Sequence, residues 1–222
     1  MLRLIFLVFL SLFMCGYSLS ADNLPLLFED NFQKGLDRWS FSDSSCWKIV
    51  DVKGEGKALS QFKKISSFKP PHRSPYHFAL IKDLSLGDFV FDAKLLSTIK
   101  DYNHRDLCLF LGYQDPAHFY YVHLGKKTDD HANQIFIVNG SDRKKISTKT
   151  TPGTNWTEAW HKARIIRNVN SGAIEVFFDD MKNPVMAASD KTFLWGQIGV
   201  GTFDDTGDWT DIKVQGVKVA PK

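Results

Sequence analysis

The sequence lacks any long apolar segment after its first 21 residues. Those residues contain Arg3, an apolar run from Leu4 to Cys15 and small residues that end at Ala21, a pattern typical of a secretory signal peptide. The run is shorter than the roughly 20 apolar residues that a membrane helix needs, and no later segment reaches that length. We therefore expect a signal peptide at 1–21, a secreted or periplasmic protein, and no membrane span.

Helical periodicity is also missing from residues 22–222. Apolar residues there alternate with polar ones, as in Asp88 to Thr98, or form short runs between turns rich in glycine, proline and asparagine. This pattern predicts about a dozen strands in two packed antiparallel sheets, an all-β fold. A chain of about 200 residues can bury one large core, so we expect a single domain over 22–222.

Cysteine is scarce, and neither sign of charge is in large excess. Cys46 and Cys108 remain after residue 21, and they could form a disulfide in an oxidising compartment or stay as two buried thiols. Their spacing does not match a metal site. The formal charge of +3 comes mostly from scattered lysines, so nucleic acid is not an expected partner.

Residues 105–140 carry the densest pattern of strands. Pro116 is preset for a corner and Asp115 can bond the backbone ahead of it, so we interpret Gln114 to Ala117 as a turn. If Tyr113 pairs with His118 across this turn, an apolar row forms on one face, which we interpret as the core face. The row consists of Leu107, Leu109, Leu111, Tyr120, Val122 and Leu124.

The opposite face of the same strands carries side chains that suit binding. The pairing places Phe110 beside Tyr121, Cys108 beside His123, and Phe119 near Gly112. This face opens next to Arg105 and Asp106. It predicts a surface that contacts a ligand, and the alternative is a second buried layer under a loop.

Four segments in order resemble the concanavalin A-like lectin/glucanase superfamily. They are GDFVFDAKLL, LCLFLGYQDPAHFYYVHLG, WHKARIIRNVNSGAIEVFFDD and GQIGVGTFDDTGDWTDIKV. The similarity runs from Phe28 to Gly216 and is greatest to the laminin-G-like and 3-keto-disaccharide hydrolase (family-16-like) branches. The resemblance implies a jelly roll whose concave sheet binds glycans, with Tyr121 and His123 on that sheet.

Two functions are compatible with these residues. The first is recognition of a poly- or oligosaccharide, because aromatic rings stack on sugars and polar side chains bond their hydroxyls. The residues expected to contact the sugar are Phe110, Phe119, His131, Asn133 and Gln134. A structural or protein-binding role is a further alternative. We expect a monomer without an organic cofactor.

The second function is cleavage of a glycosidic bond. Family-16 hydrolases use a Glu-x-Asp-x-x-Glu strand that holds two carboxyl groups about 5 Å apart, and this sequence has no such triplet. A Gly-x-Ser-x-Gly elbow is missing too. A β-eliminating polysaccharide lyase fits better, with Tyr121 and His123 as base and acid and Arg105 as the group that neutralises a uronate carboxylate.

The resemblance also implies a structural calcium ion away from the ligand face. Asp30, in the segment Phe28 to Phe32, would meet Asp211 at the opening of the last strand. A carbonyl near Gly56 could add a ligand. Calcium takes six to eight oxygen ligands, so carboxylates and carbonyls are the appropriate donors.

Overall fold

The computed structural model describes residues 24–221, which fold as a sandwich of two antiparallel sheets. The predicted signal peptide lies outside the described residues. The all-β jelly-roll prediction is confirmed, and one short 3-10 turn, Ser44–Cys46, is the exception to strand and loop in the described part of the chain. No helix among residues 24–221 is long and apolar enough to cross a membrane.

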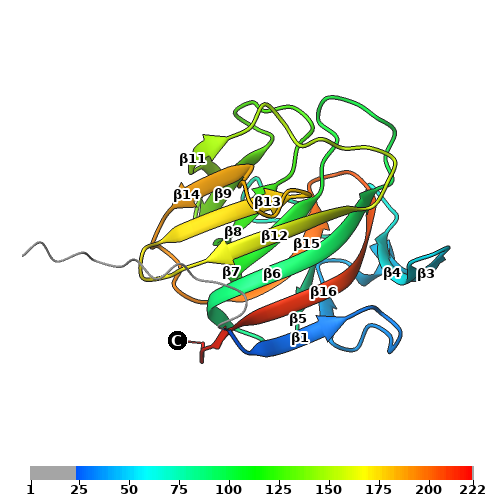
Figure 1. The fold of residues 1–222 in the computed structure, drawn as a ribbon, viewed down its shortest axis with the longest axis horizontal. Coiled ribbons are helices and arrows are strands. Elements are labelled where there is room, and N and C mark those ends of the chain that lie inside the picture. The colour runs from blue at the N-terminus through cyan, green and yellow to red at the C-terminus, as the bar shows by residue number, and fades with distance from the viewer. Residues whose placement is uncertain (1–23, 222) are drawn as a thin grey trace, which may run out of the picture.

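The larger sheet has nine strands and faces the viewer in Figure 1. Its central strand β16 pairs with β6 along one edge, while β4 and β1 share the other edge. In spatial order its strands are β11 (Ser147–Thr150), β14 (Met186–Ser189), β13 (Ala173–Phe178), β12 (His161–Arg167), β6 (Leu86–Ser97), β16 (Gly207–Lys218), β4 (Gly56–Gln61) and β3 (Trp47–Val52), with β1 (Leu26–Asp30) on β16.

The smaller sheet has seven strands and lies behind the first in Figure 1. Its order is β10 (Lys144–Lys145), β9 (Gln134–Asn139), β8 (His118–His123), β7 (Cys108–Asp115), β15 (Gln197–Thr202), β5 (His77–Ile81) and β2 (Trp39–Phe41). Strands β7, β8 and β9 are consecutive in the chain, whereas β15 and β5 join them from distant segments. The sheet therefore depends on long-range pairing.

The apolar row predicted on β7 and β8 lies in the main core between the sheets. Leu111 pairs with Tyr120 and Leu109 with Val122, as the sequence predicts. The pairing of Tyr113 with His118 is wrong, because the register shifts after Leu111 and Asp115 pairs with His118 instead. The shift occurs at Gly112, whose φ of +59° favours glycine, and it leaves Tyr113 beside Gln197 of β15.

The other face of the smaller sheet is a second buried apolar layer. It consists of Phe78, Leu80, Cys108, Phe110, Tyr113, Phe119, Tyr121, Phe136 and Val138. Phe68, from the proline-containing loop after β4, packs on this layer with its ring 5.3 Å from that of Phe78. Arg143 lies over the rings of Phe136 and Phe203. The predicted open face is therefore covered, and the alternative of a buried layer under a loop is correct.

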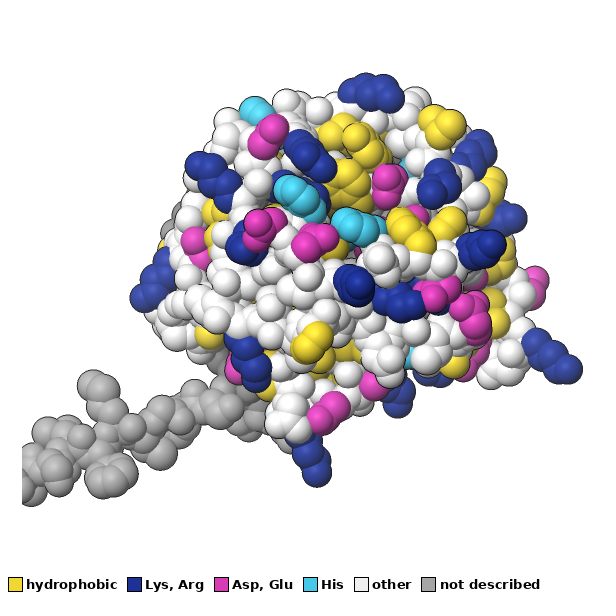
Figure 2. All heavy atoms as spheres, turned by 90° about the horizontal axis from the view of Figure 1, so that it is seen from above, with side chains coloured by type: hydrophobic (Ala, Val, Ile, Leu, Met, Phe, Trp, Pro, Cys, Tyr) yellow, Lys and Arg dark blue, Asp and Glu magenta, His cyan; other side chains and the backbone are white. Residues whose placement is uncertain are grey.

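The surface mixes charges of both signs. On the face seen in Figure 2, lysine, arginine, acidic and histidine side chains interleave, and apolar atoms show between them. Several charges are paired at the surface, among them Lys145 with Asp130 at 2.6 Å and Lys57 with Asp51 at 3.0 Å. The small net charge of +3 thus reflects a dispersed distribution.

Candidate functional sites at the two ends of the sandwich

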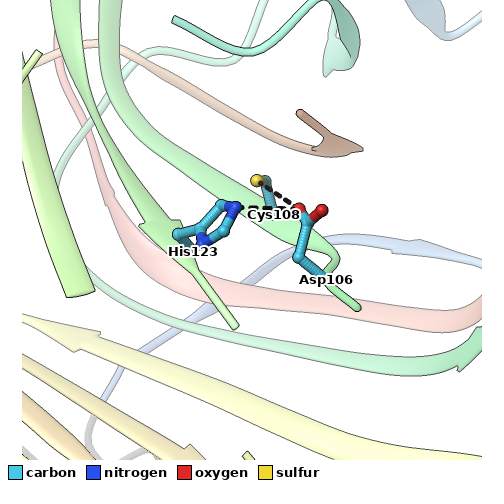
Figure 3. Close-up of side chains that lie close together, drawn as sticks. All are labelled: Asp106, Cys108 and His123. Atoms are coloured by element: carbon cyan, nitrogen blue, oxygen red, sulfur yellow. Dashed lines mark hydrogen bonds and ion pairs between the residues drawn. The ribbon is translucent and has the colours of Figure 1, made fainter. Parts of the chain in front are cut away.

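A buried polar cluster lies at the end of the smaller sheet where β7 begins and β8 ends (Figure 3). Cys108 and His123 are directly opposite each other on the two strands, and Asp106 precedes β7 by two residues. Asp106 Oδ2 lies 3.2 Å from His123 Nε2 and 3.4 Å from Cys108 Sγ. All three side chains are buried. We call this group the Asp106 cluster.

A second buried carboxylate supports the Asp106 cluster from the loop after β15. Asp205 Oδ2 accepts a hydrogen bond from the Asp106 backbone N–H at 3.0 Å, and its Oδ1 accepts one from the Tyr102 hydroxyl at 2.8 Å. Burial and the nearby Asp106 charge raise the pKa of Asp205 to about 6. Burial alone would also raise the pKa of Asp106, but the charge and hydrogen bond of His123 outweigh it and lower that pKa. The two neighbouring carboxyls therefore shift in opposite directions.

The predicted aromatic contacts are not presented to solvent. Tyr121 and Phe110 are 0% exposed and Phe119 is 2% exposed. The Tyr121 hydroxyl accepts a hydrogen bond from Arg143 Nη1 at 2.7 Å, and burial raises the pKa of its phenol. The prediction that these side chains face a ligand on an open sheet is wrong in this structure, because a loop and Arg143 cover them.

Arg105 does not join Tyr121 and His123. Its guanidinium donates to the Ser97 carbonyl at 2.9 Å and the Thr157 carbonyl at 3.0 Å, and it pairs with Glu158 at 2.9 Å. It is 1% exposed. Strand alternation places Arg105 on the side opposite to Asp106 and Cys108, so the predicted carboxylate clamp is not formed there.

The remaining predicted contacts separate into buried and exposed residues. Asn133 is buried and donates to Thr128 Oγ1 and the Thr151 carbonyl, so it holds two loops together. Gln134 pairs with His123 across β8 and β9, and its amide donates to the Asp129 carbonyl at 2.8 Å. His131 is exposed in the loop before β9. Of Asn133, Gln134 and His131, Gln134 is the one that pairs directly with His123.

Two of the three residues predicted to bind calcium, Asp30 and Asp211, line one groove of about 760 Å³ along β1 and β16. Both Asp30 oxygens already accept hydrogen bonds, from the Phe32 N–H at 2.8 Å and from Trp39 Nε1 at 2.9 Å. Asp211 lies 3.6 Å from Lys94 Nζ. Gly56 is at the start of β4 and does not line the groove. These donors fit a calcium shell poorly, and the ion stays a prediction.

A pocket of about 640 Å³ lies at the end of β7, whereas the Asp106 cluster lies at its start. Four segments far apart in the sequence form it: the turn between β5 and β6, the end of β7, the start of β15 and the C-terminal residues. Its lining residues are Asp83, Leu84, Ser85, Tyr113, Gln114, Trp195, Gln197, Lys218, Val219, Ala220 and Pro221. We call it the Trp195 pocket. Its volume is that of an ordinary small-molecule site.

Among residues 24–221, several polar groups of the Trp195 pocket have no hydrogen-bond partner in the protein. Gln114 and Gln197 use their amide nitrogens on the carbonyls of Trp195 and Ile81, at 3.1 and 2.9 Å, which leaves each amide oxygen free to accept a hydrogen bond. The buried Ser85 hydroxyl has no partner among the described residues. The pocket thus combines an indole ring with unpaired oxygens.

Sequence reasoning did not find the Trp195 pocket. Its residues lie in turns and at strand ends, and no local spacing connects positions 83, 114, 195 and 219. The one available signal is Trp195 before Gly196, a large aromatic residue in a turn at the start of a strand. The Asp106 cluster was partly predictable from the sequence, because the predicted strand pairing already placed Cys108 beside His123.

No protein-family model matches the chain, and no curated protein matches it. Solved structures of similar fold include a carbohydrate-binding module, CBM66, from Bacillus subtilis, with 18% identity and a TM-score of 0.54 over 82% of this chain and 97% of that one. Domain 4 of AbnA, a GH43 extracellular arabinanase from Geobacillus stearothermophilus, in complex with arabinotriose, is 10% identical with a TM-score of 0.57, covering 89% and 95%.

Peanut lectin is also similar, with 12% identity and a TM-score of 0.53 over 89% of this chain and all of that one. At these identities the likeness concerns the fold alone. It agrees with the jelly roll implied by the sequence resemblance to concanavalin A-like proteins, while the 3-keto-disaccharide hydrolase branch stays a prediction.

Proposed function

We propose that the chain is an exported protein that binds a poly- or oligosaccharide in the Trp195 pocket. The observation that carries the proposal is the pocket's composition, in which the aromatic residues Trp195 and Tyr113 line the same hollow as the amide side chains of Gln114 and Gln197. Export rests on the signal peptide expected from the sequence at 1–21. The fold supports the proposal, because similar structures include a carbohydrate-binding module and lectins.

Sugars present both apolar C–H faces and hydroxyl groups. A ring such as the indole of Trp195 can stack on the apolar face while neighbouring polar groups bond the hydroxyls. The amide oxygens of Gln114 and Gln197, whose nitrogens bond backbone carbonyls, are available to accept hydrogen bonds from sugar hydroxyls. A neutral or weakly charged glycan suits this set, since Asp83 and Lys218 at its rim carry opposite charges.

The proposal is tested with the purified protein and a panel of neutral and uronate glycans, in which binding is measured by calorimetry. We expect Trp195→Ala to weaken binding of the selected glycan by about tenfold, or ~1.4 kcal/mol, because the aromatic contact is lost.

Phe62→Ala is the matched control. Phe62 is an exposed aromatic residue after β4, 40% accessible and outside the Trp195 pocket, with Lys48 over its ring at 4.6 Å. Its removal should leave glycan affinity unchanged. If Trp195→Ala and Phe62→Ala bind every glycan as the wild type does, or if none of the panel binds, the proposal is wrong.

Bond cleavage is the alternative function, and the same panel addresses it. Reducing ends that appear together with absorbance from unsaturated products would indicate a lyase, and reducing ends alone would indicate a hydrolase. The residues expected for lyase chemistry are not assembled for it, because Tyr121 is buried under Arg143 and Arg105 bonds Ser97 and Thr157. Binding without products is the expected result.

A further inference from the structure

The structure assigns a second site, independent of the Trp195 pocket: Asp106, Cys108 and His123 bind a divalent transition-metal ion, and Zn²⁺ is the ion whose preferences they match best. A carboxylate oxygen, a thiolate sulfur and an imidazole nitrogen are each common zinc ligands. The three donor atoms lie within 4.8 Å of one another (Figure 3). They border the buried apolar layer of the smaller sheet, to which Cys108 belongs, where β7 begins and β8 ends. The site lies at the β7 start, and the Trp195 pocket at the β7 end.

The spacing of the donor atoms suits a tetrahedral ion. Zinc bonds of about 2.0 Å to nitrogen and oxygen and about 2.3 Å to sulfur place neighbouring ligands roughly 3.3–3.5 Å apart. The observed separations from Asp106 Oδ2 are 3.2 Å to His123 Nε2 and 3.4 Å to Cys108 Sγ. Small side-chain adjustments would therefore admit the ion, and the fourth position would be taken by water or by another oxygen donor.

The backbone holds these ligands firmly. Cys108 and His123 are directly paired on neighbouring antiparallel strands, so their separation is fixed by the sheet. The Asp106 backbone is fixed by its hydrogen bond to Asp205, and the Phe203 N–H approaches the Asp106 carboxylate at 3.3 Å. A site on such rigid elements needs little ordering when the ion binds.

The proposed ligand atoms contact one another, and the one buried polar atom of the three side chains without a partner among residues 24–221 is the His123 nitrogen that does not face Asp106. His123 is 5% exposed, and its Nδ1 has no partner among the described residues. Three carboxylates gather here, from Asp106, Asp205 and the exposed Asp204. The positive groups near them are Lys64, 3.6 Å from Asp205, His123 beside Asp106, and Arg143, whose charge acts on the Cys108 thiol. A buried divalent cation would balance the charge of the carboxylates. On binding, the Cys108 thiol loses its proton to solvent and the thiolate coordinates the ion.

Metal binding by the purified protein, first stripped with a chelator, is the direct test. We expect one Zn²⁺ per chain by equilibrium dialysis and elemental analysis, and a thiolate charge-transfer band when Co²⁺ replaces zinc. X-ray absorption of the zinc-loaded wild type should show one sulfur ligand. Zinc at a hundredfold excess over its Kd should raise the Tm by about 5–10 °C.

Cys108→Ala is the decisive variant, and Cys46→Ala is its matched control because Cys46 is the other buried free cysteine. Cys108→Ala should abolish the cobalt band and the zinc-induced rise in Tm, whereas Cys46→Ala should keep both. If Cys108→Ala does not fold, the sulfur count in the wild type decides. Failure of the wild type to bind zinc or cobalt above the level of an unrelated protein, or a zinc site without sulfur, would overturn the proposal.

Discussion

His77 is a fully buried histidine of the smaller sheet. His77 begins β5 and is 0% exposed, with Nε2 3.1 Å from the Lys64 carbonyl and Nδ1 unpartnered among the described residues. Burial lowers its pKa, although the Lys64 carbonyl and the charges of Asp43 and Asp204 act in the opposite direction. His77 is therefore held in its neutral form within the sheet.

This shift predicts how stability depends on pH. The unfolded chain binds a proton at His77 near its ordinary pKa of 6.5, while the folded chain binds it at a lower pH. The stabilisation is therefore complete above pH 6.5 and is lost as the pH falls below it, by at most ~1.4 kcal/mol per pH unit. Urea unfolding between pH 7 and 5 measures this slope.

His131→Gln, a histidine substitution at an exposed loop position, is the control for that slope. His77→Gln should flatten the slope, because glutamine does not take up a proton. A wild-type slope equal to that of His77→Gln would contradict the neutral, buried state. Where His77→Gln is too unstable to unfold reversibly, the chemical shift of the His77 ring in the wild type gives its pKa directly.

At the scale of elements, the β7–β8 hairpin shows what a local pattern can and cannot reveal. Alternation and the Asp115–Pro116 turn were enough to predict the apolar row and the placement of Cys108 beside His123. The bulge at Gly112 and the cover over the outer face were not predictable. That cover comes from Phe68 and Arg143, which are distant in the sequence, and alternation cannot tell a covered face from an open one.

The two candidate sites also differ in how far a local pattern predicts them. The Asp106 cluster consists of the β7–β8 hairpin and Asp106, two residues before β7, so the correct strand register predicts most of it. The Trp195 pocket depends on how four separate segments meet, which no local spacing encodes. Arg105 was misplaced for a third reason, because a long side chain at the start of a strand can reach a loop from the other sheet.

Arg105 fastens β6 to the loop before β12. Its guanidinium donates to the carbonyls of Ser97 and Thr157, and the first of these bonds is buried while the second is partly buried. We expect Arg105→Ala to lower the free energy of unfolding by ~2–4 kcal/mol, because a buried and a partly buried carbonyl lose a charged donor. Thermal unfolding measures the loss.

Glycan affinity of Arg105→Ala, measured where the variant is folded, should equal that of the wild type. Glu158→Gln is the milder control, because Glu158 is the exposed partner of Arg105 and contributes little in water. A selective loss of uronate binding at unchanged stability would restore the carboxylate clamp that the sequence suggested.

At the scale of the whole molecule, the C-terminal residues close the Trp195 pocket. The Val219 N–H donates to the Ser85 carbonyl at 2.9 Å, and Val219 to Pro221 line the pocket beyond β16. Most of this segment is exposed or half-buried, so it adds little to the core. Its contribution is therefore to the wall of the pocket more than to the sandwich.

Removal of residues 219–222 should weaken glycan binding severalfold while it lowers the Tm by only a few degrees. Calorimetric titration and thermal unfolding of the truncated chain measure the two effects. Lys213→Ala, an exposed change on β16 away from the pocket, is the control. A truncated chain with full affinity would show that the tail is not part of the binding wall.

The position of β16 also governs when the fold can be completed. This strand ends at Lys218, pairs with β6 along one edge, and receives β4 and β1 on the other (Figure 1). Until it is in place, β1 lacks its partner strand and the β3–β4 hairpin is not joined to the rest of the larger sheet. During synthesis β1 and the β3–β4 hairpin therefore stay apart from the rest of the larger sheet until β16 emerges, so completion of this sheet depends on long-range pairing.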